Sequence, residues 1–464
     1  MILSAFVFPH PPIVLPEIGK GRQTEIQKTI DAFEECAKQI AQQEPDTIVL
    51  VTPHSISYAD YIHISPDAAA EGDLRQFGAA DVFMSVDYDI ELSDEIEKFA
   101  VFSGISAGTL GQESPRLDHG AIIPLWFVNK YYKNYKVVRI SISGLSVAEH
   151  YRFGKVIAES AKHLGKNVVF IASGDLSHKL PEPDGVKLDA EITGSFADGD
   201  FLRLLQIPYE LCQKGAECGL RAFIIMAGVL DKTEVTAKLL SYEGPFGVGY
   251  AVASFIPCGT NSERDFLARY EVLEKIRMEE VKSNESDYVK TARFSLEHFV
   301  RTGRTPLPSE VAEALHITKS RWKELFSERA GVFVCIKKRG ELRGCIGTIS
   351  PVSENIAKEI IRNSVNAASE DPRFEPVDAG ELTELVYTVD LLKPPEKIES
   401  VSQLDVKRYG VIVTSVNGNK RGLLLPNLDS IDTVQQQVSI AKRKAGISDD
   451  EAIFLERFEV TRYT

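Results

Sequence analysis

The first half of the chain alternates short apolar, β-branched runs with stretches in which apolar residues recur at helical spacing. An unbroken apolar run of strand length is typical of a strand buried on both faces, with helices packed against it. The expected strands are Ile2–Phe8, Thr47–Thr52, Tyr135–Ser143, Asn167–Ser173, Glu234–Ser241 and Gly249–Ile256. Helical spacing is clear between the first two strands and again over Ala148–Leu164. The pattern predicts an α/β domain over residues 1–258, with a central mixed sheet flanked by helices.

The pattern changes beyond residue 258. Residues 259–284 are polar and charged around one short helical pattern, which predicts a linker. The expected later helices are Tyr288–Val300, Pro351–Val365 and Thr433–Ala445, and the expected later strands are Gly331–Lys337, Val386–Leu392 and Gly410–Ser415. These shorter, mixed elements predict a smaller α+β domain over residues 285–464.

Length and charge narrow the class of protein, because 464 residues exceed what one hydrophobic core supports and so agree with two domains. The net charge of −14 argues against a surface that binds polyphosphate, and nucleic acid is not an expected partner. No apolar stretch approaches the roughly 20 residues that cross a bilayer. Six cysteines without a C-x-x-C spacing do not resemble a disulfide framework. We therefore expect a cytoplasmic protein without a membrane partner.

Four histidines share one placement in the first domain, just after a predicted strand or in a loop marked by glycine or proline. They are His10, His54, His119 and His178. In doubly wound sheets, residues beyond the carboxyl ends of the strands converge on one crevice. The placement predicts a metal site, and the alternative is that each histidine only makes hydrogen bonds within its own loop.

Two histidines and one carboxylate on one face of an ion are a ligand set that binds iron and leaves positions open for substrate and oxygen. Glu243 follows a predicted strand and is the best placed carboxylate for the third ligand. Asp118 and Asp175 lie near His119 and His178 in sequence and are expected to fix the tautomers of these rings. His178 would then be free to transfer protons, with Asp175 as its catalytic partner.

The first domain carries several motifs in a fixed order: PHPP, TPHS, LDHGAIIPL, ASGDLSH, ECGLRAF and VGYAVASF. With them it resembles the Memo-like proteins and, more distantly, the class III extradiol ring-cleaving dioxygenases of the LigB type. The resemblance implies Fe(II), with zinc or copper as alternatives, bound by His10 and His54. It also implies that His178 is the acid–base residue and that His119 orients substrate or oxygen.

The third metal ligand stays open between two residues. Glu243 corresponds to the glutamate of the dioxygenases, and a cysteine such as Cys218 corresponds to the cysteine of the Memo-like proteins. The implied function is that of a non-haem metal oxidoreductase acting on a small molecule, for which a catechol is one candidate. The alternatives are an accessory metal protein without dioxygenase activity and a metal-dependent hydrolase or lyase, since the same ligands can activate water.

The second domain resembles the AMMECR-type domain through GVFVCIKKRGELRGCIGTISP, SEDPRFEPV and GLLLPNLDSIDTVQQQ. Fusion of the two domains resembles an arrangement that accompanies a radical S-adenosylmethionine enzyme. This chain lacks the C-x-x-x-C-x-x-C motif of such an enzyme, and it would therefore act only as its partner.

Cys345 in LRGCIG is the residue of the second domain that most suggests chemistry. Neighbouring glycine would let a ligand approach the backbone, and Arg343 would favour the thiolate, which predicts a nucleophile or a ligand-binding residue. The alternative is a small residue buried at a tight turn. Asp371 and Arg373 are expected to form a structural ion pair or to complete the same pocket.

Overall fold

The computed structural model describes residues 1–112, 116–428 and 431–464. The chain forms two compact units, Met1–Glu274 and Lys275–Thr464. The segment predicted as a linker, residues 259–284, contains the end of strand β10 and all of helix α10, Phe266–Asn284. The division between the units falls inside this helix. No helix in the described ranges is both long and apolar enough to span a membrane.

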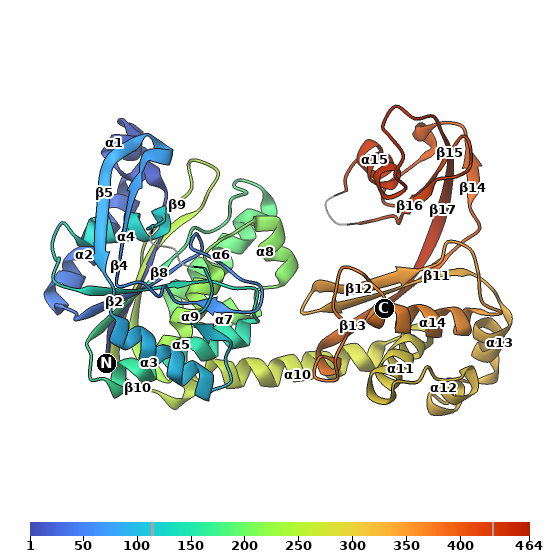
Figure 1. The fold of residues 1–464 in the computed structure, drawn as a ribbon, viewed down its shortest axis with the longest axis horizontal. Coiled ribbons are helices and arrows are strands. Elements are labelled where there is room, and N and C mark those ends of the chain that lie inside the picture. Colours follow the sequence, from blue (N-terminus) through green and yellow to red (C-terminus); the bar gives the residue numbers. More distant parts are fainter. Residues whose placement is uncertain (113–115, 429–430) are drawn as a thin grey trace. The chain divides into compact units, whose positions relative to one another are not determined.

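A six-stranded mixed sheet forms the centre of the first unit (Figure 1). Its strand order is β7-β2-β8-β1-β10-β9. Its strands are β1 (Ile2–Phe8), β2 (Thr47–Thr52), β7 (Lys136–Ser141), β8 (Val168–Ser173), β9 (Thr233–Glu243) and β10 (Tyr250–Thr260). The strands β7, β2, β8 and β1 run parallel, whereas β10 runs antiparallel to both β1 and β9. The predicted α/β class with a mixed sheet is confirmed.

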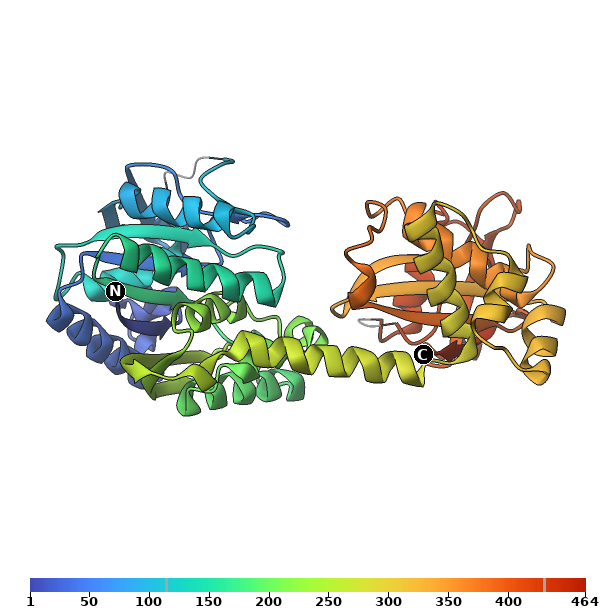
Figure 2. The same ribbon diagram turned by 90° about the horizontal axis from the view of Figure 1, so that it is seen from below.

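Helices cover both faces of this sheet (Figure 2), because alternate residues of a strand point to opposite faces and both sets are apolar here. The helices are α1 (Pro16–Gly19), α2 (Gln27–Gln43), α3 (Ile90–Phe102), α4 (His119–Val128), α5 (Val147–His163), α6 (Pro183–Asp198), α7 (Leu202–Gln206), α8 (Tyr209–Gly215) and α9 (Leu220–Val229). In β1, Phe6 and Phe8 join the core that contains α2 and α4. Ala5 and Val7 join the core on the other face, with α3, α5 and α9.

Two short strand pairs lie outside the central sheet. They are the antiparallel hairpin β4 (Ala69–Leu74) with β5 (Ala79–Asp87), and the parallel pair β3 (Ile62–His63) with β6 (Ala107–Gly108). A 3-10 turn, Arg75–Phe77, joins the strands of the hairpin. Gly78 follows this turn at a φ of 81°, in the left-handed region that glycine adopts at little cost. The turn places the ring of Phe77 near the site described below.

The second unit is built on an antiparallel sheet of order β12-β11-β13-β17-β15-β16, and β14 also pairs with β17. Its strands are β11 (Gly331–Lys338), β12 (Glu341–Gly347), β13 (Leu385–Leu392), β14 (Glu396–Ile398), β15 (Tyr409–Ser415), β16 (Arg421–Leu424) and β17 (Ile453–Tyr463). Its helices beyond α10 are α11 (Asp287–Thr302), α12 (Pro308–Ala314), α13 (Lys319–Ser327), α14 (Ile356–Ser369) and α15 (Val434–Lys444). One core joins α11 and α14 to β11 and β13, and another joins α15 to β15 and β16. The predicted α+β class is confirmed.

Candidate metal centre

Three histidines from distant parts of the sequence meet at one edge of the central sheet. His10 follows β1, His54 follows β2, and His119 begins α4. Both strands run parallel to β8, which lies between them, so their carboxyl ends lie at the same edge. The coordinating atoms of the three side chains lie within 4.8 Å of one another. We call these three residues the histidine cluster.

The spacing within the histidine cluster suits a single ion. The Nε2 atoms of His10 and His54 are 2.9 Å apart. The ring centroid of His119 lies 5.2 Å from that of His10 and 4.2 Å from that of His54. A zinc ion binds imidazole nitrogen at about 2.0–2.1 Å, so nitrogens that share one ion lie about 3–4 Å apart. Small adjustments of these rings would therefore bring three nitrogens onto one metal.

Ser173, the last residue of β8, sets the tautomer of His10. Its Oγ donates a hydrogen bond to the carbonyl oxygen of Gly120 at 2.6 Å, so it has only lone pairs to offer Nδ1 of His10, 2.9 Å away. Nδ1 of His10 therefore carries the ring hydrogen, and its Nε2 keeps a lone pair on the side of His54. This is the tautomer that a metal ligand at Nε2 requires.

Burial keeps two members of the cluster uncharged. Burial, and then the neighbouring imidazole of His54, lowers the pKa of His10 to about 3. Burial, and then the imidazoles of His10 and His54, lowers the pKa of His119 to about 3. A neutral imidazole has a nitrogen lone pair to give to a metal, whereas a charged one has none. The chemistry of these donors thus fits a divalent transition metal.

Asp118 positions the start of α4 and does not act as the predicted acceptor for the ring of His119. Its carboxylate accepts hydrogen bonds from the backbone N–H of Ala121 at 3.1 Å and from Oγ1 of Thr52 at 2.7 Å. One guanidinium nitrogen of the fully buried Arg139 lies 3.7 Å from its second oxygen. Asp118 thereby ties the N-terminus of α4, where His119 lies, to the end of β2.

Asp175 and Cys218 lie against His10. One oxygen of Asp175 accepts a hydrogen bond from the backbone N–H of His10 at 2.8 Å, and the other lies 3.9 Å from Nε2 of that ring. Burial raises the pKa of Asp175 to about 6. The sulfur of Cys218 lies 3.6 Å from Nε2 of His10 and accepts a hydrogen bond from the backbone N–H of Asp175. The predicted fallback ligand is therefore adjacent to the cluster.

His178 lies beyond β8 and is exposed to solvent, while its backbone N–H donates to the carbonyl of Gly215. Burial lowers the pKa of His10 and raises the pKa of Asp175, and the imidazole of His178 adds a smaller effect that lowers both. The position suits a residue that exchanges protons with solvent at the rim of the site.

The structure does not bring Glu243 to the histidine cluster. Its carboxylate accepts hydrogen bonds from the backbone N–H of Thr29 at 2.8 Å and from the Thr29 hydroxyl at 2.7 Å. Glu243 ends β9, which is separated from β1 by β10, and two strand spacings amount to about 9–10 Å. The carboxyl end of a strand was a correct reason to consider the residue, but the strand is too far from His10.

Phe77 is a residue of the site that the sequence analysis missed. Its ring centroid lies 5.2 Å from that of His119, and 37% of the residue is exposed. It lies on the hairpin outside the central sheet, so no rule about strand ends points to it. Ser173 was missed as well, although its place at the end of β8 could have indicated it.

In the second unit, the structure corrects the expectation for Cys345. The residue lies within β12, not at a tight turn, and forms a disulfide with Cys335, its direct partner on β11. The guanidinium of Arg343 is engaged by the carboxylate of Glu381. Cys345 is therefore not a free nucleophile in this structure.

Asp371 and Arg373 form the expected ion pair. A nitrogen of the Arg373 guanidinium lies 2.6 Å from an oxygen of Asp371, and this hydrogen bond holds the pKa of the carboxyl at about 2. The same carboxylate accepts a hydrogen bond from the backbone N–H of Cys345 at 2.9 Å. The ion pair thus holds the backbone of the edge strand β12 at Cys345.

Fold and site together define an α/β protein with three histidines gathered at the carboxyl ends of parallel strands, followed by an α+β domain. Residues 4–253 match the family described as the catalytic LigB subunit of aromatic ring-opening dioxygenase, and residues 289–464 match the AMMECR1 family. The chain belongs to the LigB family and continues into an AMMECR1 domain. The resemblances to the LigB type and to the AMMECR-type domain are thereby confirmed.

Several proteins are similar in sequence or structure to parts or all of this chain. A protein of Clostridium acetobutylicum is 40% identical over 483 residues, covering 100% of this chain and 99% of its own length. A Thermotoga maritima protein is 47% identical over 181 residues, which are 39% of this chain and 98% of that protein. The crystal structure of an uncharacterized Escherichia coli K12 protein is 15% identical with a TM-score of 0.38, covering 54% of this chain and 99% of its own.

Proposed function

We propose that the first unit binds one divalent metal, Fe(II), through His10, His54 and His119, and acts as an oxidoreductase of the dioxygenase type on a small molecule. A catechol is the first substrate class to test. The proposal rests on three imidazoles whose coordinating atoms lie within 4.8 Å of one another at the carboxyl edge of a LigB-family sheet. When bound, Fe(II) would supply the redox chemistry towards dioxygen that the side chains themselves lack.

The other side chains of the site would each have a separate role. His178, exposed at the rim, would exchange a proton with the substrate hydroxyl, and Asp175 would hold the backbone of His10 in place. Phe77 would offer its ring as a wall beside His119. Cys218 is close enough to His10 to contribute a further donor. Glu243 has no part in this proposal because its carboxylate is bound to Thr29.

Metal analysis of protein prepared without oxygen tests the ligand set. The wild-type chain should carry about one metal per chain, and His10→Ala, His54→Ala and His119→Ala should each lose it. His163→Ala is the matched control, because this exposed histidine pairs with Glu95 on α3, away from the cluster. Full metal content in the three cluster variants would overturn the proposal.

Oxygen consumption with a panel of catechols tests the reaction. Iron-loaded wild type should consume oxygen and form a yellow ring-opened product, whereas His178→Ala should keep its iron and lose most of the rate. Iron binding with no oxygen uptake from any catechol would leave the metal site intact and reject the dioxygenase reaction.

A second candidate is a metal-dependent hydrolase or lyase. Three imidazoles without a carboxylate ligand are also a set that catalytic zinc uses. Stoichiometric zinc in protein isolated from cells, with ester or amide hydrolysis that does not need oxygen, would favour this candidate over the first. A cytoplasmic location and a radical S-adenosylmethionine enzyme as partner stay predictions.

A further inference from the structure

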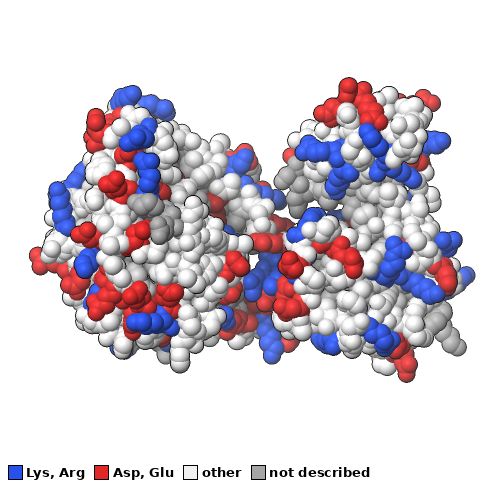
Figure 3. Space-filling view, viewed as in Figure 1, with Lys and Arg blue, Asp and Glu red and all other residues white. Residues whose placement is uncertain are grey.

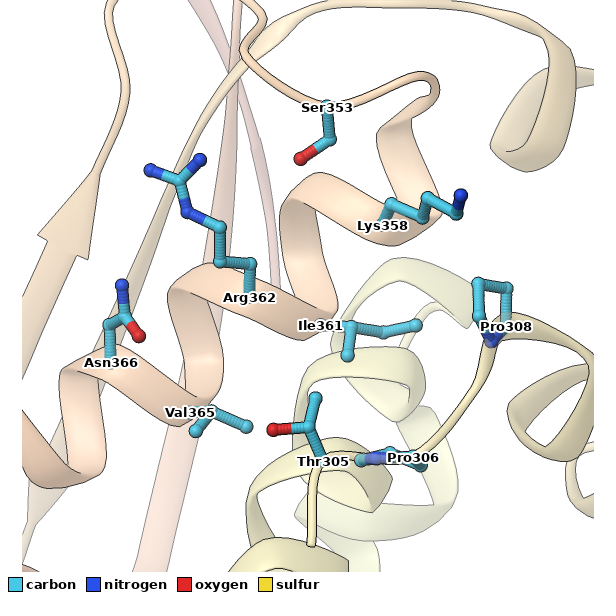
Figure 4. A pocket seen from close by; sticks show the side chains of 9 residues that line it. All are labelled: Thr305, Pro306, Pro308, Ser353, Lys358, Ile361, Arg362, Val365 and Asn366. Carbon is cyan, nitrogen blue, oxygen red and sulfur yellow. The ribbon is translucent and has the colours of Figure 1, made fainter.

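A pocket of about 300 Å³ lies in the second unit, between α14 and the segment that leads into α12 (Figure 4). Its apolar lining comes from Ile361 and Val365 on the helix and from Pro306 and Pro308 opposite. Figure 4 shows Ile361 directed towards Pro308, and Val365 towards Thr305. The volume is at the lower end of the range of about 300–1,000 Å³ for small-molecule pockets.

The stripe of α14 that lines this pocket differs from the stripe that packs against β11, and its apolar members Ile361 and Val365 are themselves buried. Residues three and four positions apart share one face of a helix, and the lining residues Lys358, Ile361, Arg362, Val365 and Asn366 follow that spacing. Ala357, Ile360 and Ala367 lie instead in the core against β11. The pocket-lining face carries cationic and amide groups, which the packing of the helix does not require.

The charge of Arg362 is not matched by a carboxylate. The guanidinium of this exposed residue has no hydrogen-bond or ion-pair partner within the described ranges. The chain carries a net charge of −14, and acidic and basic side chains are interspersed on the face seen in Figure 3. Other arginines nearby are paired: Arg304 with Glu310, and Arg343 with Glu381. Lys358, the second cation of the pocket, is neutralised by Glu354 at 2.6 Å.

Two further polar groups of the pocket are free to bind. Within the described part of the chain, the side-chain amide of Asn366 and the hydroxyl of Thr305 form no hydrogen bond with the protein. Asn366 lies one helical turn beyond Arg362, so the amide and the guanidinium are neighbours on α14. The unpaired guanidinium of Arg362, the amide of Asn366 and the hydroxyl of Thr305 therefore line the pocket together with its apolar residues.

We propose that this pocket binds a small organic carboxylate, whose anionic end pairs with the Arg362 guanidinium and whose apolar body lies on Ile361 and Val365. A guanidinium can match a carboxylate with two parallel hydrogen bonds, and the apolar residues beside it favour an organic carboxylate over inorganic phosphate. A single unpaired cation fits a single negative charge better than a doubly charged phosphate. The amide of Asn366 and the hydroxyl of Thr305 would fix the orientation of the ligand.

Saturation-transfer NMR and calorimetry with benzoate on the full chain test the proposal, with a chelator present to keep the first unit free of metal. Wild type should bind benzoate with a Kd of about 1 mM or tighter. Arg362→Gln should weaken binding at least about tenfold, because the charge-assisted pair is lost. Arg301→Gln is the matched control, since this exposed arginine pairs with Glu297 on α11 and should leave binding unchanged.

Further ligands and variants test the ion pair with Arg362 and the apolar contact separately. Benzyl alcohol should bind at least about tenfold more weakly than benzoate, and inorganic phosphate should not displace it. Equal affinity of benzyl alcohol, or equal affinity of Arg362→Gln and wild type, would overturn the pairing with Arg362. Displacement of benzoate by phosphate would overturn the contact between the apolar body of the ligand and Val365. Unchanged benzoate binding by Val365→Thr would overturn the same contact. Absence of benzoate binding to the folded wild type would overturn the proposal as a whole.

Discussion

Ser173 controls the ring of His10 through a hydroxyl whose own hydrogen is already donated to Gly120. In Ser173→Ala, Nδ1 of His10 loses its acceptor and the ring loses its fixed tautomer, so metal affinity should fall about 10–100-fold. Competition with a chromogenic chelator measures the change. Ser195→Ala removes a different buried hydroxyl, bonded to the carbonyl of Asp200, and should have no effect on metal affinity. Equal affinity of Ser173→Ala and wild type would show that the tautomer is set in another way.

Phe77 should act on an aromatic ligand and not on the metal. Removing its ring in Phe77→Ala should weaken the binding of 4-nitrocatechol to metal-loaded protein by about 1 kcal/mol, or about fivefold, with the metal content unchanged. Optical titration of the bound nitrocatechol gives the affinity. Phe83→Ala is the control, because Phe83 is exposed on β5 of the same hairpin. A loss of equal size in both variants would assign the effect to the hairpin and not to the ring.

Asp189 should make the stability of the first unit depend on pH. Burial raises the pKa of its carboxyl to about 6, although the carboxylate accepts hydrogen bonds from the backbone N–H of Ser177 and the hydroxyl of Tyr242. Because the folded pKa lies above the unfolded value of about 3.9, this group stabilises the fold fully below pH 4 and loses the contribution as pH rises through 6.

Thermal unfolding of wild type and Asp189→Asn at pH 4 and pH 7 checks the sign. The wild type should lose stability relative to the variant on going from the lower to the higher pH. A difference between the two proteins that is the same at both pH values would contradict the prediction.

Among the elements, the inner strands β1, β2 and β8 of the central sheet could be predicted because each is buried on both faces and therefore forms an unbroken apolar run. β8 is buried at all of its positions, and the sequence marks it clearly. In the second unit, β12, β14, β16 and β17 were not predicted. β17 has a single buried residue, Phe458, and β12 has only Gly344, so neither carries such a run.

The sequence predicted those residues of the candidate site that directly follow a strand. His10 and His54 follow directly from the ends of β1 and β2. Glu243 was misplaced because a sequence gives the order of strands along the chain and not their order across the sheet, where β10 separates β9 from β1. Phe77 and the bond between Ser173 and His10 depend on contacts between distant segments, which no local pattern contains.

The disulfide between Cys335 and Cys345 should stabilise the β11–β12 hairpin only modestly. A cross-link that closes a loop of 10 residues contributes at most about 2–3 kcal/mol, and these strands are already paired by backbone hydrogen bonds. We expect a reductant to lower the unfolding temperature of the wild type and to leave the double variant C335S and C345S unaffected. Identical unfolding of the wild type with and without reductant would contradict this expectation.

For the whole molecule, the division at Glu274 separates the two proposed binding sites completely. All three residues of the histidine cluster lie in Met1–Glu274, and the pocket around Arg362 lies in Lys275–Thr464. We expect residues 1–274 expressed alone to bind metal with the stoichiometry of the full chain. Metal analysis of that fragment, alongside residues 275–464 as the control, measures this. A folded first fragment without metal would show that the second unit is needed for binding.

The position of β8 between β1 and β2 also governs when the site can form during synthesis. A nascent chain that has just emerged as far as residue 130 already contains His10, His54 and His119. It lacks Val168–Ser173, the strand against which both β1 and β2 align in the finished sheet. We therefore expect the cluster to assemble only after the ribosome has added some forty further residues, because β1 and β2 have no common strand to align against before then.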